Sequence, residues 1–202
     1  SDLAESSISL FPPEGVLETF ISSLPFELTN AQKRVLEEVT QDLISSKKPM
    51  SRLIQGDVGS GKTVIALAAL VTAATSGFQS AIMAPTEILA EQHFLTVTSL
   101  LQGLAEPSIK QHLISIRLHP YPKPILIGLL LGNTPAKAKR ELQAMLSEGT
   151  LDIVIGTHAV IQENVSIPNL SLAIVDEQHR FGVKQRAALC EHGKQPHMLV
   201  MS

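Results

Sequence analysis

The 202-residue sequence has one cysteine, Cys190, no tryptophan and only 3% aromatic residues. One cysteine excludes an internal disulfide framework and suits a reducing compartment. No apolar run reaches the ~18 residues that a membrane-spanning helix needs. Residues 1–6 also lack the basic and then apolar order of a secretory signal. We therefore expect a protein with no membrane partner.

Charge is scarce as well, with 16 Lys and Arg, 19 Asp and Glu, and a net charge of −3. This balance lacks the basic signature of a simple nucleic-acid coat. It remains compatible with a motor that contacts the DNA backbone through local loops and N–H groups. Hydrophobic residues, in contrast, make up 44% of the chain, enough for the sizeable core of one domain.

Two kinds of apolar segment alternate along most of the chain. Continuous apolar runs predict buried strands at residues 52–55, 81–84, 125–131, 152–155, 172–175 and 198–201. Helical spacing predicts helices at residues 16–24, 30–44, 64–74, 87–101 and 136–147. The alternation predicts an α/β fold, a mostly parallel sheet with helices on both faces. The proline-rich segment 102–124 interrupts it and predicts an inserted loop or hairpin.

A phosphate-binding loop is predicted where residues 56–63 fit the pattern G-x-x-x-x-G-K-[ST]. A loop that leaves a strand and enters a helix directs its N–H groups and the positive helix end at an anion. Lys62 adds a charge for the β- and γ-phosphates, and Thr63 offers a hydroxyl to Mg²⁺. The nucleotide-binding residues of this loop are Gly56, Gly59, Ser60, Gly61, Lys62 and Thr63. The alternative is a glycine turn with an incidental lysine, which the strand–loop–helix context disfavours.

Two neighbouring acids, Asp176 and Glu177, follow the apolar run 172–175. They should therefore lie at the carboxyl end of a buried strand, where ligands bind in open α/β sheets. We expect Asp176 to hold Mg²⁺, directly or through water, and Glu177 to orient and deprotonate the attacking water. The alternative is an Asp-Glu helix cap. The phosphate loop upstream favours the catalytic interpretation, and the two segments together indicate ATP hydrolysis.

The series of motifs resembles superfamily 2 helicases, and among them the RecG-type branched-DNA helicases. The matching segments are residues 24–32 (adenine recognition), 56–63 (phosphate loop), 84–93 (motif Ia), 156–159 (motif Ib) and 176–186 (motif II). The resemblance implies a RecA-like P-loop NTPase domain at residues 25–202, after a lead-in and helix at residues 1–24. Gln178 argues against transcription–repair coupling factors, the nearest relatives, which usually have Glu there. Residues 131–133 depart from the family's Thr-Gly-Ser stretch, which puts one hydroxyl contact to DNA in doubt.

The resemblance also implies roles for single residues. Gln32 would pair with the edge of adenine, and Phe26 would pack beside the base. Gln178 and His179, with Lys62, Asp176 and Glu177, would complete the catalytic set by sensing the γ-phosphate. DNA phosphates would be contacted by Pro85, Thr86, Glu87, Gly156, Thr157 and His158. The plainer alternatives are a surface glutamine, helix-capping segments and a packed neutral histidine.

The family further implies ATP and Mg²⁺ as cofactors and forked or branched duplex DNA as the substrate. A second RecA-like motor domain and a wedge domain would be partners, so we expect a C-terminally truncated motor domain. The implied setting is bacterial cytoplasm, with nucleoid association, or an organelle of bacterial descent. Two other classes stay open: a nucleotide-dependent nucleic-acid-binding switch and, more weakly, a small-molecule kinase. Of the other residues, we expect His112, His119, His192 and His197 to face solvent and Cys190 to be buried.

Overall fold

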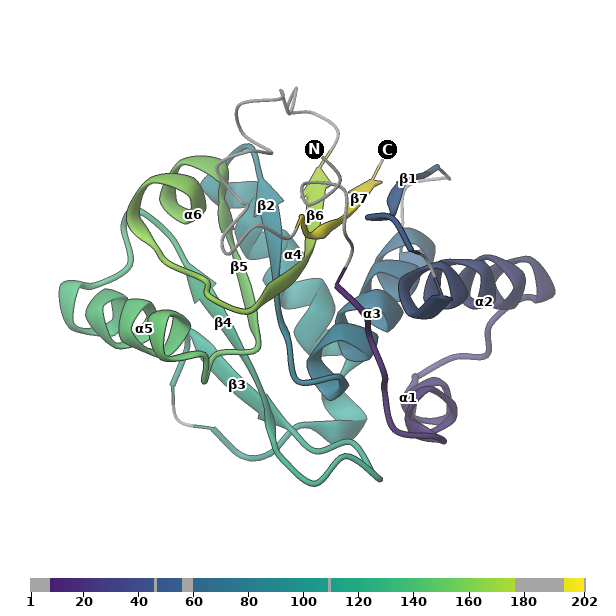
Figure 1. Cartoon of the computed structure of the whole chain (residues 1–202). Helices are drawn as coiled ribbons and strands as arrows, with labels where there is room; N and C mark the ends of the chain where they lie inside the picture. Colours follow the sequence, from purple (N-terminus) through teal and green to yellow (C-terminus); the bar gives the residue numbers. More distant parts are fainter. Residues whose placement is uncertain (1–7, 46, 56–59, 109, 177–194, 202) are drawn as a thin grey trace.

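The apolar runs of the sequence form the strands of one mixed sheet, shown in Figure 1. The computed structural model describes residues 8–45, 47–55, 60–108, 110–176 and 195–201. Within these residues the sheet has seven strands in the order β1-β7-β6-β2-β5-β4-β3. They are β1 (Ser51–Ile54), β2 (Gln79–Ala84), β3 (Leu113–Ile116), β4 (Ile125–Leu130), β5 (Ile153–Thr157), β6 (Leu170–Asp176) and β7 (His197–Met201). All neighbouring strands are parallel except β3 and β4, so the predicted α/β fold is confirmed.

Helices cover both faces of this sheet, as the alternation of apolar segments predicted. The helical elements are α1 (Val16–Ser23), α2 (Asn30–Ser45), α3 (Ser60–Thr75), α4 (Glu87–Leu100), η2 (Gln102–Leu104), α5 (Ala136–Glu148) and α6 (His158–Asn164). Successive residues of a strand point to opposite faces. Accordingly, Ile82 packs with α1 to α4, while Ala81 and Met83 pack with α5 and α6. None of the helices in the described part of the chain is long and apolar enough to cross a membrane.

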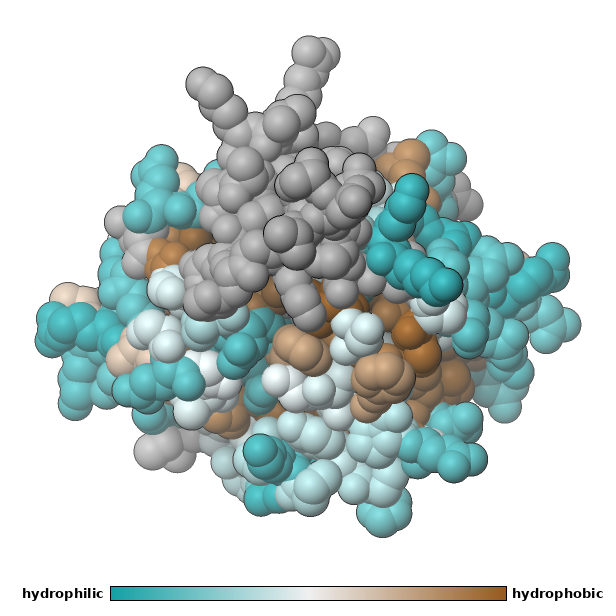
Figure 2. All heavy atoms as spheres, in the orientation of Figure 1, coloured by the Kyte–Doolittle hydropathy of each residue, from teal (hydrophilic) through white to brown (hydrophobic). Residues whose placement is uncertain are grey.

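Helix α3 is the centre of the larger core. Its residues from Val64 to Val71 are at most 6% exposed, because α3 contacts the sheet on one side and α1, α2 and α4 on the others. A helix that is apolar all round is buried on all sides. The expected lead-in also contributes, since Leu10, Val16 and Phe20 belong to the same core. Figure 2 shows the contrast at the surface, where hydrophilic residues gather over α5 and α2 at the two sides of the molecule.

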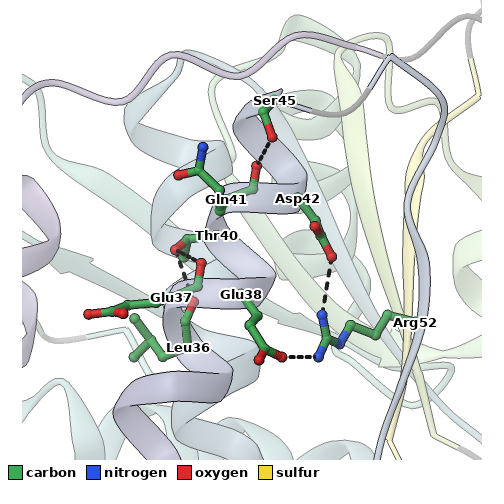
Figure 3. Close-up of polar contacts among 8 residues, drawn as sticks. All are labelled: Leu36, Glu37, Glu38, Thr40, Gln41, Asp42, Ser45 and Arg52. Atoms are coloured by element: carbon green, nitrogen blue, oxygen red, sulfur yellow. Dashed lines mark hydrogen bonds and ion pairs between the residues drawn. The ribbon is translucent and has the colours of Figure 1, made fainter.

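Strand β1, at the edge of the sheet, is held to α2 by an arginine. Arg52 lies 2.6 Å from Glu38 Oε2 and 3.1 Å from Asp42 Oδ2 (Figure 3). The hydrogen bond to Glu38, the largest cause, raises the pKa of Arg52, with a further contribution from Asp42. The two acids are four residues apart, so they lie on the same side of α2. The contact fixes β1, the strand that leads into the phosphate loop, against the helix that precedes it.

The segment 102–124, expected to be an inserted loop or hairpin, contributes one strand, β3, to a hairpin whose second strand is β4, the strand expected at residues 125–131. Strand β3 pairs antiparallel with β4, from Leu113 opposite Gly128 to Ile116 opposite Ile125. An isolated bridge joins Ala105 to Ile116 and extends this edge of the sheet. The insertion therefore adds an edge strand at the side of the sheet away from β1.

The expectation that His197 faces solvent is wrong. His197 begins β7, between β1 and β6, and its side chain is 0% exposed. Its Nδ1 accepts the N–H of Met50 at 2.9 Å, and its Nε2 donates to the carbonyl of Ile8 at 2.8 Å. Burial lowers the pKa of His197, which favours the neutral ring that this pair of contacts requires. His119 is exposed as expected, His112 is half-buried, and His192 and Cys190 lie outside the described residues.

A half-buried acid before β5, Asp152, gives a prediction on how stability depends on pH. Asp152 Oδ2 accepts the N–H of Leu126 at 2.8 Å, and burial raises the pKa of Asp152 to about 6. A carboxyl whose folded pKa is raised contributes stability below its unfolded pKa and loses it as pH rises toward the folded value. Asp152→Asn keeps the acceptor and removes the buried charge. We expect it to raise the free energy of unfolding at pH 7.5 by about 1–2 kcal/mol.

Urea unfolding of both proteins at pH 7.5 and pH 4 measures this effect. At pH 4 the advantage of Asp152→Asn should disappear, because the folded wild-type carboxyl is then protonated. A variant that is less stable than wild type at pH 7.5, or equally stabilised at both pH values, would contradict the assignment of this charge as buried and unfavourable.

Candidate functional site

The carboxyl ends of the parallel strands lie at one edge of the sheet, and two of them, the ends of β1 and β6, adjoin the predicted ATP-site segments in the sequence. Ile54, the last residue of β1, pairs with Met201 of β7, and Asp176, the last residue of β6, pairs with Met201 from the other side. Adjacent strands lie about 4.8 Å apart, so the Cα atoms of Ile54 and Asp176 lie on one level about 10 Å apart. Strand β1, which precedes the phosphate loop in the sequence, therefore ends at the same edge of the sheet as Asp176.

The described part of the phosphate loop is the first turn of α3. Ser60, Gly61, Lys62 and Thr63 lie there, and the last three are half-buried. The N–H groups of a first helical turn have no partner inside the helix, which suits them to an anion. Gly56, Gly59, Glu177, Gln178 and His179 lie outside the described residues, so their roles stay predictions.

Gln32 lies close to the first turns of two helices, its own helix α2 and helix α3. Its Oε1 accepts the N–H of Thr29 at 2.9 Å, and Thr29 Oγ1 accepts the N–H of Gln32 at 3.1 Å. This reciprocal pair is a capping box, and it begins α2. A Cβ on Gly61 would lie 3.1 Å from Gln32 Nε2, so the amide also reaches the start of α3. Gln32 is thus more than a surface residue, and its pairing with adenine stays a prediction.

Phe26 lies at an open cleft before α2. The cleft has a volume of about 600 Å³ and is lined by Ile21, Ser22, Leu24, Pro25, Phe26, Glu27, Leu28 and Lys33. Phe26 is 36% exposed, which is less than the exposure of Phe11, Leu53, Ile88 and Leu95. An exposed ring beside a cleft is available to pack against a planar base.

The expected DNA-contacting segments lie on the same edge of the sheet, after β2 and β5. Thr86 caps α4 by accepting the N–H of Leu89 at 3.2 Å, and Thr157 caps α6 by accepting the N–H of Val160 at 3.4 Å. Both threonines therefore have the capping role that was the plainer alternative. Thr86 is exposed and its neighbours Pro85 and Glu87 are half-buried. DNA contact by this segment stays a prediction.

The second segment, Gly156 to His158, is more enclosed. Thr157 is 8% exposed and His158 6% exposed. A Cβ on Gly156 would collide with the carbonyl oxygen of Leu130, so close approach of β4 and β5 accounts for this glycine. The structure thus gives Gly156 a packing reason that motif resemblance alone did not provide.

His93 is a site residue to which sequence reasoning gave no role. Its Nε2 lies 3.2 Å from Asp176 Oδ2, and the two side chains are 18% and 16% exposed. A signal was available in the sequence, because Ala90, His93, Phe94 and Val97 form the i, i+3, i+4, i+7 stripe of a buried helix face. A histidine in such a stripe needs a polar partner, and Asp176 provides one.

Comparison with known proteins agrees with this arrangement. The model of the DEAD/DEAH box helicase family matches residues 29–202. The ATP-dependent DNA helicase RecG of Thermotoga maritima is 50% identical over 191 residues, which cover 94% of this chain and 22% of the relative. RecG of Synechocystis sp. is 46% identical over 195 residues, covering 96% and 21%. The chain therefore spans about a fifth of the length of these relatives.

Solved structures give the same result for the fold. The structure of RecG bound to a three-way DNA junction matches with a TM-score of 0.77 and 43% identity, covering 97% of this chain and 24% of that chain. The helicase MrfA bound to DNA matches with a TM-score of 0.64 at 15% identity, which bears on the fold alone. The predicted RecA-like fold and the similarity to RecG-type helicases are confirmed. The chain belongs to the DEAD/DEAH box helicase family.

Proposed function

We propose that this chain is the first motor domain of a RecG-type ATP-dependent DNA helicase acting on forked or branched DNA. The observation that carries the proposal is the common edge at which β1 enters the phosphate loop and β6 ends in Asp176. The identities of 40–50% to RecG proteins favour this function over a nucleotide-dependent switch or a transcription–repair coupling factor. We place the ATP-binding domain at residues 25–202, with residues 1–24 as a lead-in whose described residues, 8–24, pack on it.

The residues at this edge fit ATP with Mg²⁺. Thr63 offers a hydroxyl and Asp176 a carboxylate, and Mg²⁺ prefers oxygen ligands. Among the described residues no group of three or more His, Cys, Asp or Glu side chains could hold a metal. This suits an ion that is held by one or two protein oxygens and by the nucleotide phosphates. Bound there, Mg²⁺ would neutralise charge on the β- and γ-phosphates.

The remaining roles are those that the family resemblance implies. Lys62 would contact the phosphates, Gln32 and Phe26 the base, and Glu177 the attacking water, with Gln178 and His179 sensing the γ-phosphate. The segments 85–87 and 156–158 would receive DNA phosphates. The length of the relatives supports further domains in the full-length polypeptide. We propose that these include a second RecA-like domain and a wedge domain. The bacterial relatives support action in the bacterial cytoplasm, and we propose that it takes place at the nucleoid.

The proposal is tested by ATP turnover of the full-length protein with forked DNA and with linear duplex of equal length. We expect forked DNA to stimulate turnover more strongly and to be unwound in an ATP-dependent manner. We expect the proposed second motor domain to supply an arginine finger, an arginine that stabilises the transferred phosphoryl group. This chain alone should therefore turn over ATP slowly, since loss of such an arginine costs about 10³–10⁵ in rate in other phosphoryl-transfer enzymes. ATP-dependent DNA binding without unwinding or translocation would instead support the switch.

A further inference from the structure

A hydrogen bond joins helix α4 to the predicted magnesium ligand at the end of β6. His93 Nε2 lies 3.2 Å from Asp176 Oδ2. An ionised carboxylate only accepts hydrogen bonds, so the imidazole must carry a proton on Nε2 and donate it. The contact therefore fixes which nitrogen of His93 is protonated and favours one rotation of the Asp176 carboxylate.

The imidazole is itself held in place by packing. His93 is 18% exposed and lies between Ala90 and Phe94, which are 0% and 6% exposed. Helix α4 contacts β2, β5 and α3, so the turn that carries His93 is anchored on several sides. A side chain with a restricted rotamer can orient its partner, whereas a mobile surface side chain cannot.

The same helix begins at the segment predicted to meet DNA. Thr86, the N-cap of α4, is exposed and precedes His93 by seven residues, about two helical turns or roughly 10 Å. The donor to Asp176 and the exposed start of α4 thus belong to one rigid element. Orientation of the carboxylate is tied to the position of this helix.

We propose that His93 is a positioning residue that orients Asp176 for Mg²⁺ through the Nε2–H···Oδ2 hydrogen bond. The inference rests on the proposed function, since it assumes that Asp176 serves a nucleotide-bound Mg²⁺. Partners that orient metal ligands are worth about 10–100-fold in metal affinity in other proteins. His93 should therefore affect how nucleotide binding depends on Mg²⁺, and should leave binding without Mg²⁺ unchanged.

Three variants separate this role from simple packing. His93→Phe keeps a ring of similar size and removes the donor. His93→Gln places an amide N–H at a similar reach, so it should restore the function. Ser99→Ala, at an exposed position of the same helix, is the matched control.

The measurement is the affinity of the full-length protein for a fluorescent ADP analogue, with EDTA and across a series of Mg²⁺ concentrations. We expect the Mg²⁺ concentration at half-effect to rise about tenfold or more in His93→Phe. Its affinity in EDTA should equal that of the wild type. His93→Gln should lie within roughly threefold of the wild type, and Ser99→Ala should be indistinguishable from it.

A wild-type Mg²⁺ dependence in His93→Phe would overturn the proposal. Equal weakening with EDTA and with Mg²⁺ would overturn it too, because His93 would then act on the fold or on the nucleotide pocket as a whole. The variants can be compared in an Asp176→Asn background, where His93→Phe should add no further shift. If the wild type shows no Mg²⁺-dependent nucleotide binding, that result contradicts the proposed function itself, independently of any variant.

Discussion

Replacement of Lys62 by alanine is expected to lower DNA-stimulated ATP turnover by about 10²–10³-fold, the usual loss when one fixed stabilising group is removed from the transition state. Lys62 lies in the first turn of α3, at the edge of the sheet where β1 ends level with Asp176. From there its ammonium would offset the charge on the transferred phosphoryl group. Steady-state ATPase assays with saturating forked DNA measure the effect on kcat.

Lys110→Ala is the matched control for this variant. Lys110 is exposed near the edge strand β3, and its ammonium lies 3.6 Å from Glu141. The same charge is removed, so net charge and general attraction of DNA change equally. We expect wild-type turnover from Lys110→Ala. ATP turnover by Lys62→Ala close to that of the wild type would contradict the assignment of Lys62 to the phosphates.

Replacement of Gln79 by leucine is expected to cost about 3–5 kcal/mol of stability, since each buried group left unsatisfied costs about 1–3 kcal/mol. Gln79 is 1% exposed at the start of β2. Its Nε2 donates to the carbonyls of Leu146 and Leu151 at 3.0 and 2.9 Å, and its Oε1 accepts the N–H of Asn169 at 3.1 Å. Leucine fits the volume but leaves the carbonyl of Leu151 and the N–H of Asn169 without this partner, whereas the carbonyl of Leu146 still accepts the N–H of Gly149 at 3.1 Å.

Urea unfolding of the chain measures this change. The urea concentration at the unfolding midpoint should fall. The slope of the free energy of unfolding against urea concentration should stay the same, as it does when stability alone changes. Gln111→Leu, at an exposed position, makes the same chemical change and should stay within about 0.5 kcal/mol of wild type. An unchanged midpoint in Gln79→Leu would show that water or the backbone replaces the amide.

Periodicity in the sequence predicted the elements of this fold where apolar residues define them. The helix expected at residues 64–74 is α3, and the structure begins it at Ser60. The first turn of α3 was not predicted as helix, because it consists of glycine and polar residues and so has no apolar period. Strand β3 was not predicted either, although three of its four residues are apolar, because so short a run in a proline-rich segment shows no clear period.

Contacts between distant residues limited the prediction of single side chains. His197 was expected at the surface, but its partners Met50 and Ile8 are 147 and 189 residues away. Gln79 bonds with residues 67 to 90 positions later, and nothing near it in sequence indicates a buried amide. Asp176 could be placed because it directly follows an apolar run. His93 could not be given a role, because its partner is 83 residues away.

The order of strands has a consequence for synthesis on the ribosome. In the described sheet β1 pairs with β7 alone, yet about 150 residues separate them in the chain. At 5–20 residues per second, β1 emerges roughly 7–30 s before its neighbour exists. During that interval its unpaired edge and the helix that follows it are open to chaperones or to wrong pairing. The nascent chain can therefore complete the sheet edge proposed to bind nucleotide only after β7 has been translated.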